Sequence, residues 1–253
     1  MKRFLLLALA AATLGIFSAC AQNKTAAAPI TPTAPVAPAA GARPAIKRII
    51  LIGYGPFAGR AQNASWQSVK QFAGQRPVSG FEQAVVWFQP QRTLAYLSAE
   101  LTEPCIIVGL GEADRDFRVE LTAFNARGNY PDVAGNKPDP LKIAADGAAQ
   151  LEVTGPGGLI QQKLAARGWP ARISHDAGRY LCNEMLYELL QAQKGNPNIA
   201  GAFFIHVPVL NRMVPGPDGK MVKADEAYME RFGRDLAAVL QEIFSLAGAD
   251  GRP

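Results

Sequence analysis

A cysteine lies in the stretch of this chain with the strongest potential for chemistry. Residues 174–187 read SHDAGRYLCNEMLY, and from Cys182 onward the apolar residues recur at helical spacing. The unpaired N–H groups and the dipole of a helix N-terminus stabilise an anion, so a thiol placed there is more often the nucleophilic thiolate. A buried, unreactive cysteine is the alternative that this stretch leaves open.

A histidine ends the second stretch of interest. Residues 201–208 read GAFFIHVP, an apolar run of strand length that Pro208 stops. Ligands of open α/β sheets bind outside the carboxyl ends of the strands, where His206 would emerge. A nucleophilic cysteine needs a histidine that takes its proton and returns it to the leaving amine, and the chain has only His175 and His206. A hydrogen-bonded core histidine is the alternative for His206.

The elements that must position these two residues follow a pattern of strands alternating with helices. Apolar runs predict buried strands, an apolar–polar alternation predicts one half-exposed strand, and helical spacing predicts the helices. This order predicts an α/β fold with three layers and a mostly parallel sheet. The expected strands are 47–53, 83–88, 104–110, 117–123 (half-exposed) and 201–208, and the expected helices are 65–73, 93–101, 160–167, 182–193 and 224–246.

The cysteine and histidine stretches together resemble the signature of the pyrrolidone carboxyl peptidases, also called pyroglutamyl peptidases type I. That family has a serine, Ala-Gly, an aromatic residue and Cys-Asn, followed downstream by GFIHVP. This chain carries both motifs in that order, and the resemblance extends from Lys47 to about Leu210. It implies a three-layer α/β/α sandwich with a twisted, mostly parallel mixed sheet. It also implies a cysteine peptidase that removes an N-terminal pyroglutamyl (5-oxoproline) residue from peptides through a thioester.

The resemblance implies a catalytic role for three residues. Cys182 would attack the carbonyl, His206 would act as base and then as acid, and Glu120 would accept the other ring N–H of His206. A solvated glutamate on an exposed strand face is the alternative for Glu120. The main-chain N–H groups of a Gly109–Leu110 turn, together with that of Cys182, would bind the oxyanion.

The resemblance also implies a pocket for the pyroglutamyl ring, whose two apolar faces suit aromatic planes. Residues 54–66 read YGPFAGRAQNASW, which is similar to the family's opening loop. Tyr54 and Phe57 would sandwich the ring, Asn63 matches a family asparagine, and Tyr180 would line the same pocket. Aromatic residues that simply pack on the core are the alternative.

This chain departs from the family at several positions. Tyr54 replaces a phenylalanine and Ala58 a glycine, and Leu121 and Tyr130 stand where the family has arginines. Arg127 lies near Tyr130 in the sequence and is a candidate replacement. The departures leave two alternatives: the same three catalytic residues acting on another N-terminal acyl group, or a catalytically weak binding protein on this scaffold.

The first part of the chain predicts export. Residues 1–21 have a basic start and an apolar run, as in a secretory signal, and SAC at 18–20 predicts lipidation of Cys20. Cleavage after Ala21, which would release a soluble periplasmic protein, is the alternative. Residues 22–45 are rich in Ala, Pro and Thr and read as a disordered tether, so we expect the peptidase-like domain at 46–253.

The charge and composition of the chain limit the kinds of partner and cofactor that we expect. The net charge is +5, and no Lys/Arg cluster is interleaved with aromatics, so we expect no nucleic-acid partner. Three cysteines and two histidines show no ligand spacing, so no metal or cofactor is expected. Cys105 lies inside an apolar run and should be buried, inert and unpaired. From the leader we expect contact with a membrane only through the lipid anchor. By family analogy we expect assembly into a homo-oligomer.

Overall fold

The computed structural model describes residues 45–216 and 218–245. The expected leader at 1–21, the lipidation site Cys20 and the tether up to residue 44 lie outside the described residues. Within the described ranges, no helix has the length and apolar character needed to cross a membrane.

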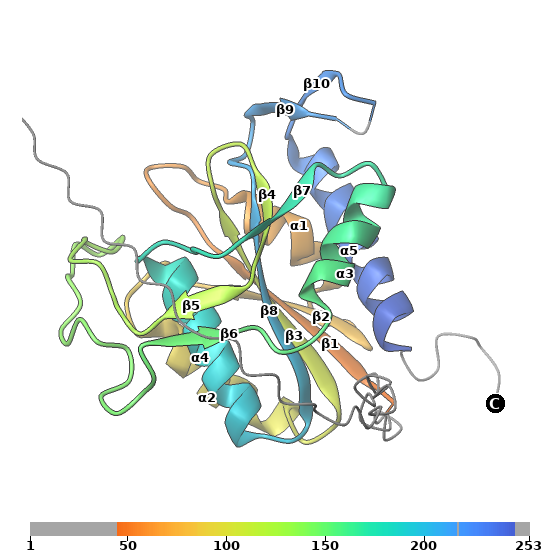
Figure 1. Cartoon of the computed structure of the whole chain (residues 1–253). Coiled ribbons are helices and arrows are strands. Elements are labelled where there is room, and N and C mark those ends of the chain that lie inside the picture. The colour runs from red at the N-terminus through yellow and green to blue at the C-terminus, as the bar shows by residue number, and fades with distance from the viewer. Residues whose placement is uncertain (1–44, 217, 246–253) are drawn as a thin grey trace, which may run out of the picture. The chain divides into compact units, whose positions relative to one another are not determined.

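A six-stranded mixed sheet forms the centre of the domain, with strand order β2-β1-β3-β8-β4-β7 (Figure 1). Every pair of neighbours runs parallel except β4 and β8, which are antiparallel. The mostly parallel mixed sheet predicted from the sequence is therefore confirmed. Its strands are β1 (Arg48–Tyr54), β2 (Val78–Gln83), β3 (Cys105–Glu112), β4 (Phe117–Glu120), β7 (Ala171–Ser174) and β8 (Ile199–Val207).

Helices cover both faces of this sheet and complete the three layers. One face carries α1 (Ala64–Val69), α3 (Gly157–Ala166) and α5 (Glu226–Phe244), and the other carries α2 (Gln89–Leu97) and α4 (Leu181–Gly195). Short 3₁₀ turns, η1 (Lys70–Phe72) and η2 (Ser98–Glu100), extend α1 and α2. Two small antiparallel pairs lie outside the main sheet: β5 (Thr122–Phe124) with β6 (Gln150–Glu152), and β9 (Met213–Pro215) with β10 (Met221–Lys223).

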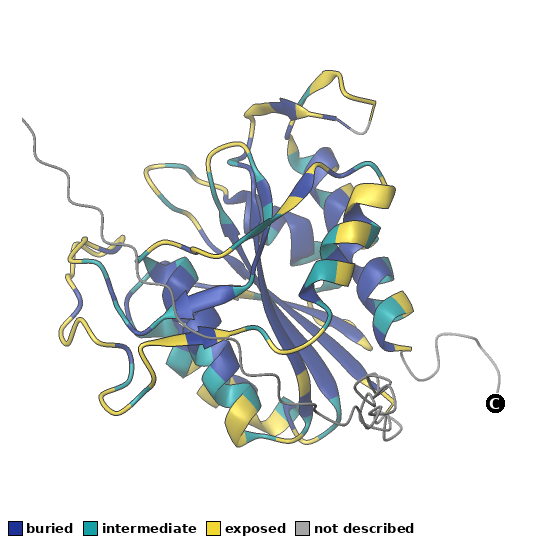
Figure 2. Ribbon diagram, in the orientation of Figure 1, coloured by how far each residue is buried: buried dark blue, intermediate teal, exposed yellow. Residues whose placement is uncertain are grey.

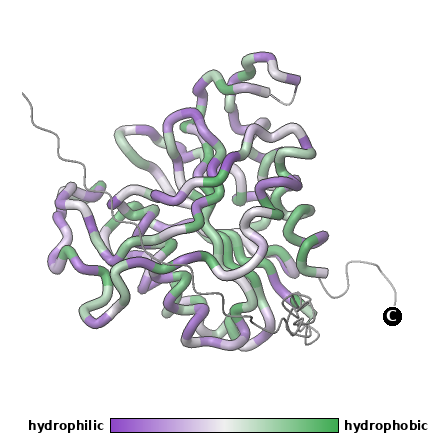
Figure 3. The backbone as a smooth tube through the Cα atoms, viewed as in Figure 1, coloured by the Kyte–Doolittle hydropathy of each residue, from purple (hydrophilic) through white to green (hydrophobic). Residues whose placement is uncertain are grey.

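The strands read as continuous apolar runs because both of their faces are buried. Figure 2 shows the sheet buried between helices whose outer surfaces are exposed, and in Figure 3 the central strands form the most hydrophobic part of the domain. Alternate residues of one strand enter different cores: Ile49 and Leu51 of β1 pack with α1 and α5, whereas Ile50 and Ile52 pack with α2 and α4. The sheet thereby separates two layers of side chains.

The strand predicted at 83–88 is wrong, because β2 covers Val78–Gln83 and ends where the predicted strand begins. Val85 and Trp87 are buried in a connecting loop rather than in the sheet. The main-chain N–H of Trp87 donates to Asp132, and its indole N–H donates to the carbonyl of Tyr130. The apolar residues of this segment therefore cover the core from a loop, which composition alone does not distinguish from a strand.

The half-exposed strand predicted at 117–123 is also wrong in its exposure. Strand β4 ends at Glu120, and after Leu121 the residues of β5, Thr122–Phe124, leave the main sheet and pair with β6. Both alternating sets of side chains are largely buried, including the polar residues Glu120 and Thr122. Tertiary packing against β8 and α4 thus buries side chains whose types indicate a solvated face.

Candidate active site

Cys182 is the second residue of α4, at the helix N-terminus predicted from the sequence. Tyr180 is the N-cap in an extended conformation, and Gly178 at φ 81° makes the turn that precedes it. The Cys182 sulfur lies directly over β3: a Cβ built on Gly111 would be 2.8 Å from Sγ. Only a glycine at that position leaves room for the sulfur.

His206 lies beside this sulfur, because Gly111 and His206 are register partners on the neighbouring strands β3 and β8. Phe204, two residues earlier on the same face, meets the imidazole edge-on with ring centroids 5.1 Å apart. The same Phe204 ring also lies against Gly111, 2.8 Å from the built Cβ. The strand register therefore brings the cysteine and the histidine together although they come from a helix and a strand.

Glu120 supplies the third side chain. Its Oε1 lies 2.7 Å from Nδ1 of His206, and the carboxylate is fully buried. Glu120 is the register partner of Phe204 on the antiparallel strand β4, so its side chain projects from the same face as the imidazole and reaches it diagonally. A bond at Nδ1 leaves Nε2 as the ring nitrogen available to the thiol.

The electrostatics of this cluster favour a charged histidine. Burial lowers the pKa of His206, but the charge and hydrogen bonding of Cys182 and Glu120 outweigh it and raise the pKa to about 9. Burial alone would raise the pKa of Glu120, yet its hydrogen bond to His206 and the nearby Ser174 and Arg118 hold it below the ordinary value. At neutral pH the cluster is therefore an imidazolium held by a buried carboxylate, beside the sulfur of Cys182.

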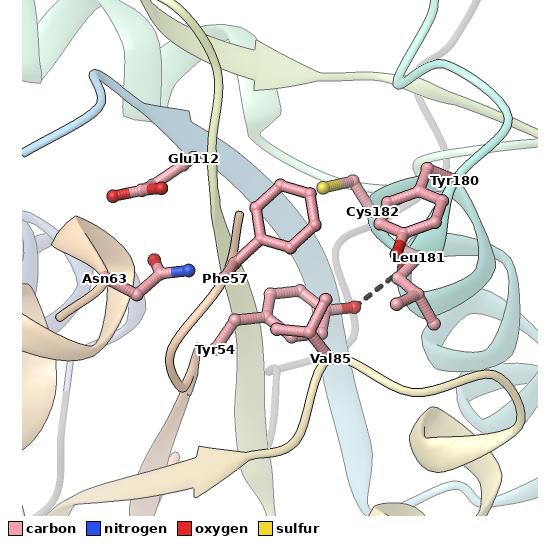
Figure 4. A pocket seen from close by; sticks show the side chains of 8 residues that line it. All are labelled: Tyr54, Phe57, Asn63, Val85, Glu112, Tyr180, Leu181 and Cys182. Atoms are coloured by element: carbon pink, nitrogen blue, oxygen red, sulfur yellow. Dashed lines mark hydrogen bonds between the residues drawn. The ribbon is translucent and has the colours of Figure 1, made fainter. Parts of the chain in front are cut away.

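A narrow apolar pocket opens next to Cys182 (Figure 4). All four residues predicted to bind the substrate line it, and three further residues do so without having been predicted. The cavity measures about 50 Å³. The lining residues are Tyr54, Phe57, Asn63 and Tyr180, as predicted, with Cys182 and the additional Val85, Glu112 and Leu181.

Aromatic contacts and one hydrogen bond hold the pocket walls. The rings of Phe57 and Tyr180 lie 5.7 Å apart, and Trp87 supports Tyr180 from behind with an edge contact at 5.0 Å. The hydroxyl of Tyr54 donates to the carbonyl of Leu181 at 2.7 Å. The hydroxyl that distinguishes Tyr54 from phenylalanine is therefore bonded to the residue that precedes Cys182.

Asn63 has both a structural and a pocket-facing group. Its side-chain oxygen caps α1 by accepting from the main-chain N–H of Ser65 at 3.0 Å, and it also accepts from the Ser65 hydroxyl. The amide nitrogen is turned toward the cavity (Figure 4). The cap fixes the orientation of the amide, so the group offered to a ligand is an N–H donor.

The predicted oxyanion turn at Gly109–Leu110 is wrong. Both residues lie inside β3, paired with Phe204 and Ile205 of β8, and Gly109 also pairs with Ile52 of β1. Gly109 and Leu110 therefore belong to a strand rather than to a turn, and Leu110 lies just beyond the last residue of β3 that pairs with β1. Whether their N–H groups bind the oxyanion stays a prediction. The main-chain N–H of Cys182 belongs to the first turn of α4, where N–H groups have no acceptor within the helix, and its role as an oxyanion donor stays a prediction.

The departures from the family have clear structural positions. Leu121 packs against the core between the sheet and α3, and Tyr130 is exposed. Arg127 is buried and pairs with Glu184, its Nε donating to Oε1 at 2.8 Å, while its guanidinium stacks on Phe88. Arg127 thus braces the first turn of α4 and does not line the pocket.

Arg118 near Glu120 was missed at the sequence level. Its Nε lies 3.8 Å from Oε1 of Glu120, and its register partner on β8 is His206. The alternation of residues 117–123 placed Arg118 and Glu120 on one strand face, and that was the available signal. The same alternation also indicates a solvent-exposed strand face, which is the interpretation that the structure contradicts.

The other two titratable candidates have minor roles. Cys105 is fully buried at the opposite end of β3 from Gly111, and burial raises the pKa of its thiol to about 11, as expected for an inert cysteine. Cys105 and Cys182 are both free. His175 is exposed on the loop before α4, with Nδ1 3.1 Å from the hydroxyl of Thr122.

A cysteine at a helix N-terminus, a histidine braced by a buried glutamate and an adjacent apolar pocket on an α/β/α domain define a cysteine hydrolase. The model of the pyroglutamyl peptidase family matches residues 47–224. The chain therefore belongs to the pyroglutamyl peptidase family of cysteine peptidases.

Individual relatives agree with this assignment. Pyrrolidone-carboxylate peptidase 1 of Photorhabdus laumondii is 33% identical over 177 residues, covering 65% of this chain and 80% of the relative. The enzyme of Klebsiella pneumoniae is 30% identical over 201 residues, covering 77% and 93%. Among solved structures, the pyrrolidone carboxyl peptidase of Thermococcus litoralis superposes with a TM-score of 0.63 at 25% identity, covering 82% of this chain and 97% of that one. Pyroglutamyl peptidase I of Bacillus amyloliquefaciens superposes at 0.62 with 26% identity, covering 76% and 95%.

Proposed function

We propose that this protein removes an N-terminal pyroglutamyl residue from peptides, with Cys182, His206 and Glu120 as its catalytic residues. The observation that supports this proposal most strongly is that the three side chains converge beside one pocket. The sulfur lies over Gly111, the register partner of His206, and His206 is bonded at 2.7 Å to Glu120. Relatives named pyrrolidone-carboxylate peptidase support the choice of substrate.

The reaction proceeds in two halves. The Cys182 thiolate attacks the pyroglutamyl carbonyl, and a carbon–sulfur bond forms while negative charge collects on the carbonyl oxygen. The His206 imidazolium gives its proton to the amine nitrogen as the carbon–nitrogen bond breaks, leaving a thioester. Neutral His206 then takes a proton from water, hydroxide adds to the thioester, and 5-oxoproline leaves as the thiolate and imidazolium are restored.

The surroundings of each catalytic group suit these reaction steps. Glu120 holds the Nδ1 side of His206 and stabilises the imidazolium, so that Nε2 serves the sulfur and the leaving amine. The main-chain N–H of Cys182 at the start of α4 is a donor available to the developing oxyanion, and the helix dipole adds to its effect.

The pocket fits a small flat ring that has polar edges. Tyr54, Phe57 and Tyr180 offer aromatic surface to the apolar faces, and the Asn63 amide offers a donor to a ring carbonyl. A free N-terminal amine carries a full positive charge, and the carboxylate in the lining, that of Glu112, is already paired with Arg60, so desolvation of the amine there would be costly. The pocket therefore favours a neutral, cyclised terminus over an ordinary one.

Hydrolysis of pyroglutamyl 7-amino-4-methylcoumarin tests the proposal directly. We expect release of the coumarin by the wild type, loss with iodoacetamide, and loss of about 10⁴-fold or more in Cys182→Ala. Cys105→Ala is the matched control and should keep its activity, since that thiol lies at the other end of β3. A folded wild type that releases no coumarin, or a fully active Cys182→Ala, would contradict the proposal. Retained ligand binding without turnover would favour a binding protein instead.

The same proposal places the enzyme outside the bacterial cytoplasm, in the periplasm, held at a membrane by lipid on Cys20. The support is the sequence itself: basic residues at positions 2–3, an apolar run and the residues SAC at 18–20. Metabolic labelling with a fatty acid should mark the wild type but not Cys20→Ala. Unlabelled wild type recovered in the soluble periplasmic fraction would favour cleavage after Ala21. Light scattering of the purified domain tests for the homo-oligomer expected by family analogy.

A further inference from the structure

Glu112 places a buried carboxylate in the wall of the ring pocket, and the catalytic cluster does not use it. It is the last residue of β3, and its side chain is only 3% exposed. Carboxylates are almost never this buried unless they are paired and hydrogen-bonded. Its place in an otherwise apolar pocket therefore calls for a role.

Three partners hold this carboxylate in one position. Oε1 accepts from the main-chain N–H of Ala64 at 2.8 Å and from that of Leu210 at 3.3 Å, and Oε2 forms an ion pair with Arg60. Arg60 belongs to the loop that also carries Phe57, and its guanidinium lies 5.7 Å from the centre of the Phe57 ring. The charge is thus compensated from outside the pocket. A carboxylate has about four lone-pair sites, so it retains acceptor capacity toward a ligand.

The Asn63 amide lies next to this carboxylate. Ala64, whose N–H binds Glu112, directly follows Asn63, and both side chains line the cavity on the side away from Cys182 (Figure 4). The amide nitrogen is a donor with its orientation fixed by the helix cap, whereas the carboxylate is only an acceptor. One wall of the pocket therefore presents an adjacent donor and acceptor.

A lactam ring carries the complementary pair on one edge, since its C=O accepts and its N–H donates in a cis amide. We propose that Glu112 accepts the ring N–H of the pyroglutamyl group and is a specificity-determining residue; this inference rests on the proposed function. The Asn63 amide donates to the ring carbonyl at the same edge. Because the acceptor is charged and buried, a ring that lacks the N–H loses a strong hydrogen bond and leaves the carboxylate facing carbon.

The test compares two substrates that differ only at the ring nitrogen. One is the pyroglutamyl coumarin amide, and the other is the 3-oxocyclopentane-1-carboxamide of the same coumarin, in which CH₂ replaces N–H. We expect the wild type to prefer the lactam by about 10- to 100-fold in kcat/KM. Glu112→Gln keeps one oxygen for Ala64 and Leu210 but turns an NH₂ toward the ring. It should lower kcat/KM for the lactam by about tenfold and leave the carbocycle nearly unchanged.

Arg60→Gln is the matched control, because it removes the ion-pair partner but leaves the acceptor in place. It should preserve the preference for the lactam, whatever its effect on overall activity. Equal losses on both substrates in Glu112→Gln would mean a purely structural carboxylate and would overturn the inference. A wild type that cleaves both substrates equally well would overturn it without any variant. A wild type that cleaves neither would contradict the proposed function itself, and the inference with it.

Discussion

The two faces of the central sheet are formed by the same strands but differ in the residues that they present. Toward α1, α3 and α5 the interior positions of β3, β4 and β8 are apolar: Ile106, Val108, Leu110, Phe117, Val119, Phe203, Ile205 and Val207. The last residue of β3 on this face is the charged Glu112, which binds the first residue of α1. Toward α4, the intervening positions begin as Cys105, Ile107 and Ala202 and end as Gly111, Glu120 and His206. One face is core at all its interior positions, whereas the other changes from core to candidate active site along its length.

This difference shows how the fold separates stability from chemistry. The apolar face is close-packed and contributes to the free energy of folding, while the second face buries charges that are tolerated only because they are paired. A two-residue periodicity allows the two to coexist, since His206 and Ile205 are neighbours in the chain but lie in different layers. Substitutions at neighbouring positions should therefore affect either turnover or stability.

Glu120→Gln should lower turnover far more than any substitution on the apolar face of the sheet. The amide has the same shape but cannot stabilise the imidazolium, so we expect kcat to fall by about 10³- to 10⁴-fold, with a thermal unfolding midpoint close to that of the wild type. Steady-state kinetics with the coumarin substrate and a circular-dichroism melt measure both. Glu152→Gln, an exposed residue on β6, is the control and should be fully active. Activity in Glu120→Gln near the wild-type level would remove Glu120 from the catalytic residues.

Gly111→Ala tests the contact between the sheet and the nucleophile. The new Cβ would lie 2.8 Å from the Cys182 sulfur and must displace it, so kcat/KM should drop by about 10- to 100-fold. The rate of alkylation by iodoacetamide should change as well. Gly158→Ala on α3 is the control, because no heavy atom lies within 4 Å of its built Cβ. Equal activity of the two variants would show that the sulfur does not depend on the space over Gly111.

Ile205→Ala should affect the other face of the same strand. Ile205 is fully buried, so its truncation should lower the free energy of unfolding by about 2–5 kcal/mol. We expect kcat to stay within about twofold of the wild-type value under conditions where the variant is folded. Urea denaturation and initial rates provide the two measurements. A large loss of kcat in a fully folded variant would break the proposed separation between the faces.

The smallest expected effect is a shift in the pH dependence of activity, which tests the pair of His206 and Glu120 specifically. His206 must be protonated to donate to the leaving amine, and its pKa is raised to about 9, so activity should fall as pH rises through about 9. Because Glu120 contributes to this increase, the residual activity of Glu120→Gln should fall at a lower pH than that of the wild type. An alkaline limb at an unchanged pH in that variant would mean that the carboxylate does not set the protonation of His206.

Much of this arrangement was predictable because it depends on local patterns. The helix N-terminus at Cys182 and the strand that ends after His206 follow from apolar spacing and from Pro208, and both are confirmed. The segment at 83–88 was mistaken for a strand because a buried loop and a buried strand share the same apolar composition. Nothing local shows that Trp87 donates its hydrogen bonds to Asp132 and Tyr130 instead of to a neighbouring strand.

The sequence by itself determined which residue types were available, where the helix that carries Cys182 begins and where the strand that carries His206 ends, because propensity, capping and periodicity act over a few residues. Only the tertiary structure decided which polar groups meet. The register of β3, β8 and β4 brings Gly111, His206 and Glu120 to one place, and it takes Gly109 and Leu110 into the sheet. It also places Glu112 in the pocket beside Asn63, 49 residues away in the chain. Such contacts depend on packing between distant segments, which the local sequence of either segment does not encode.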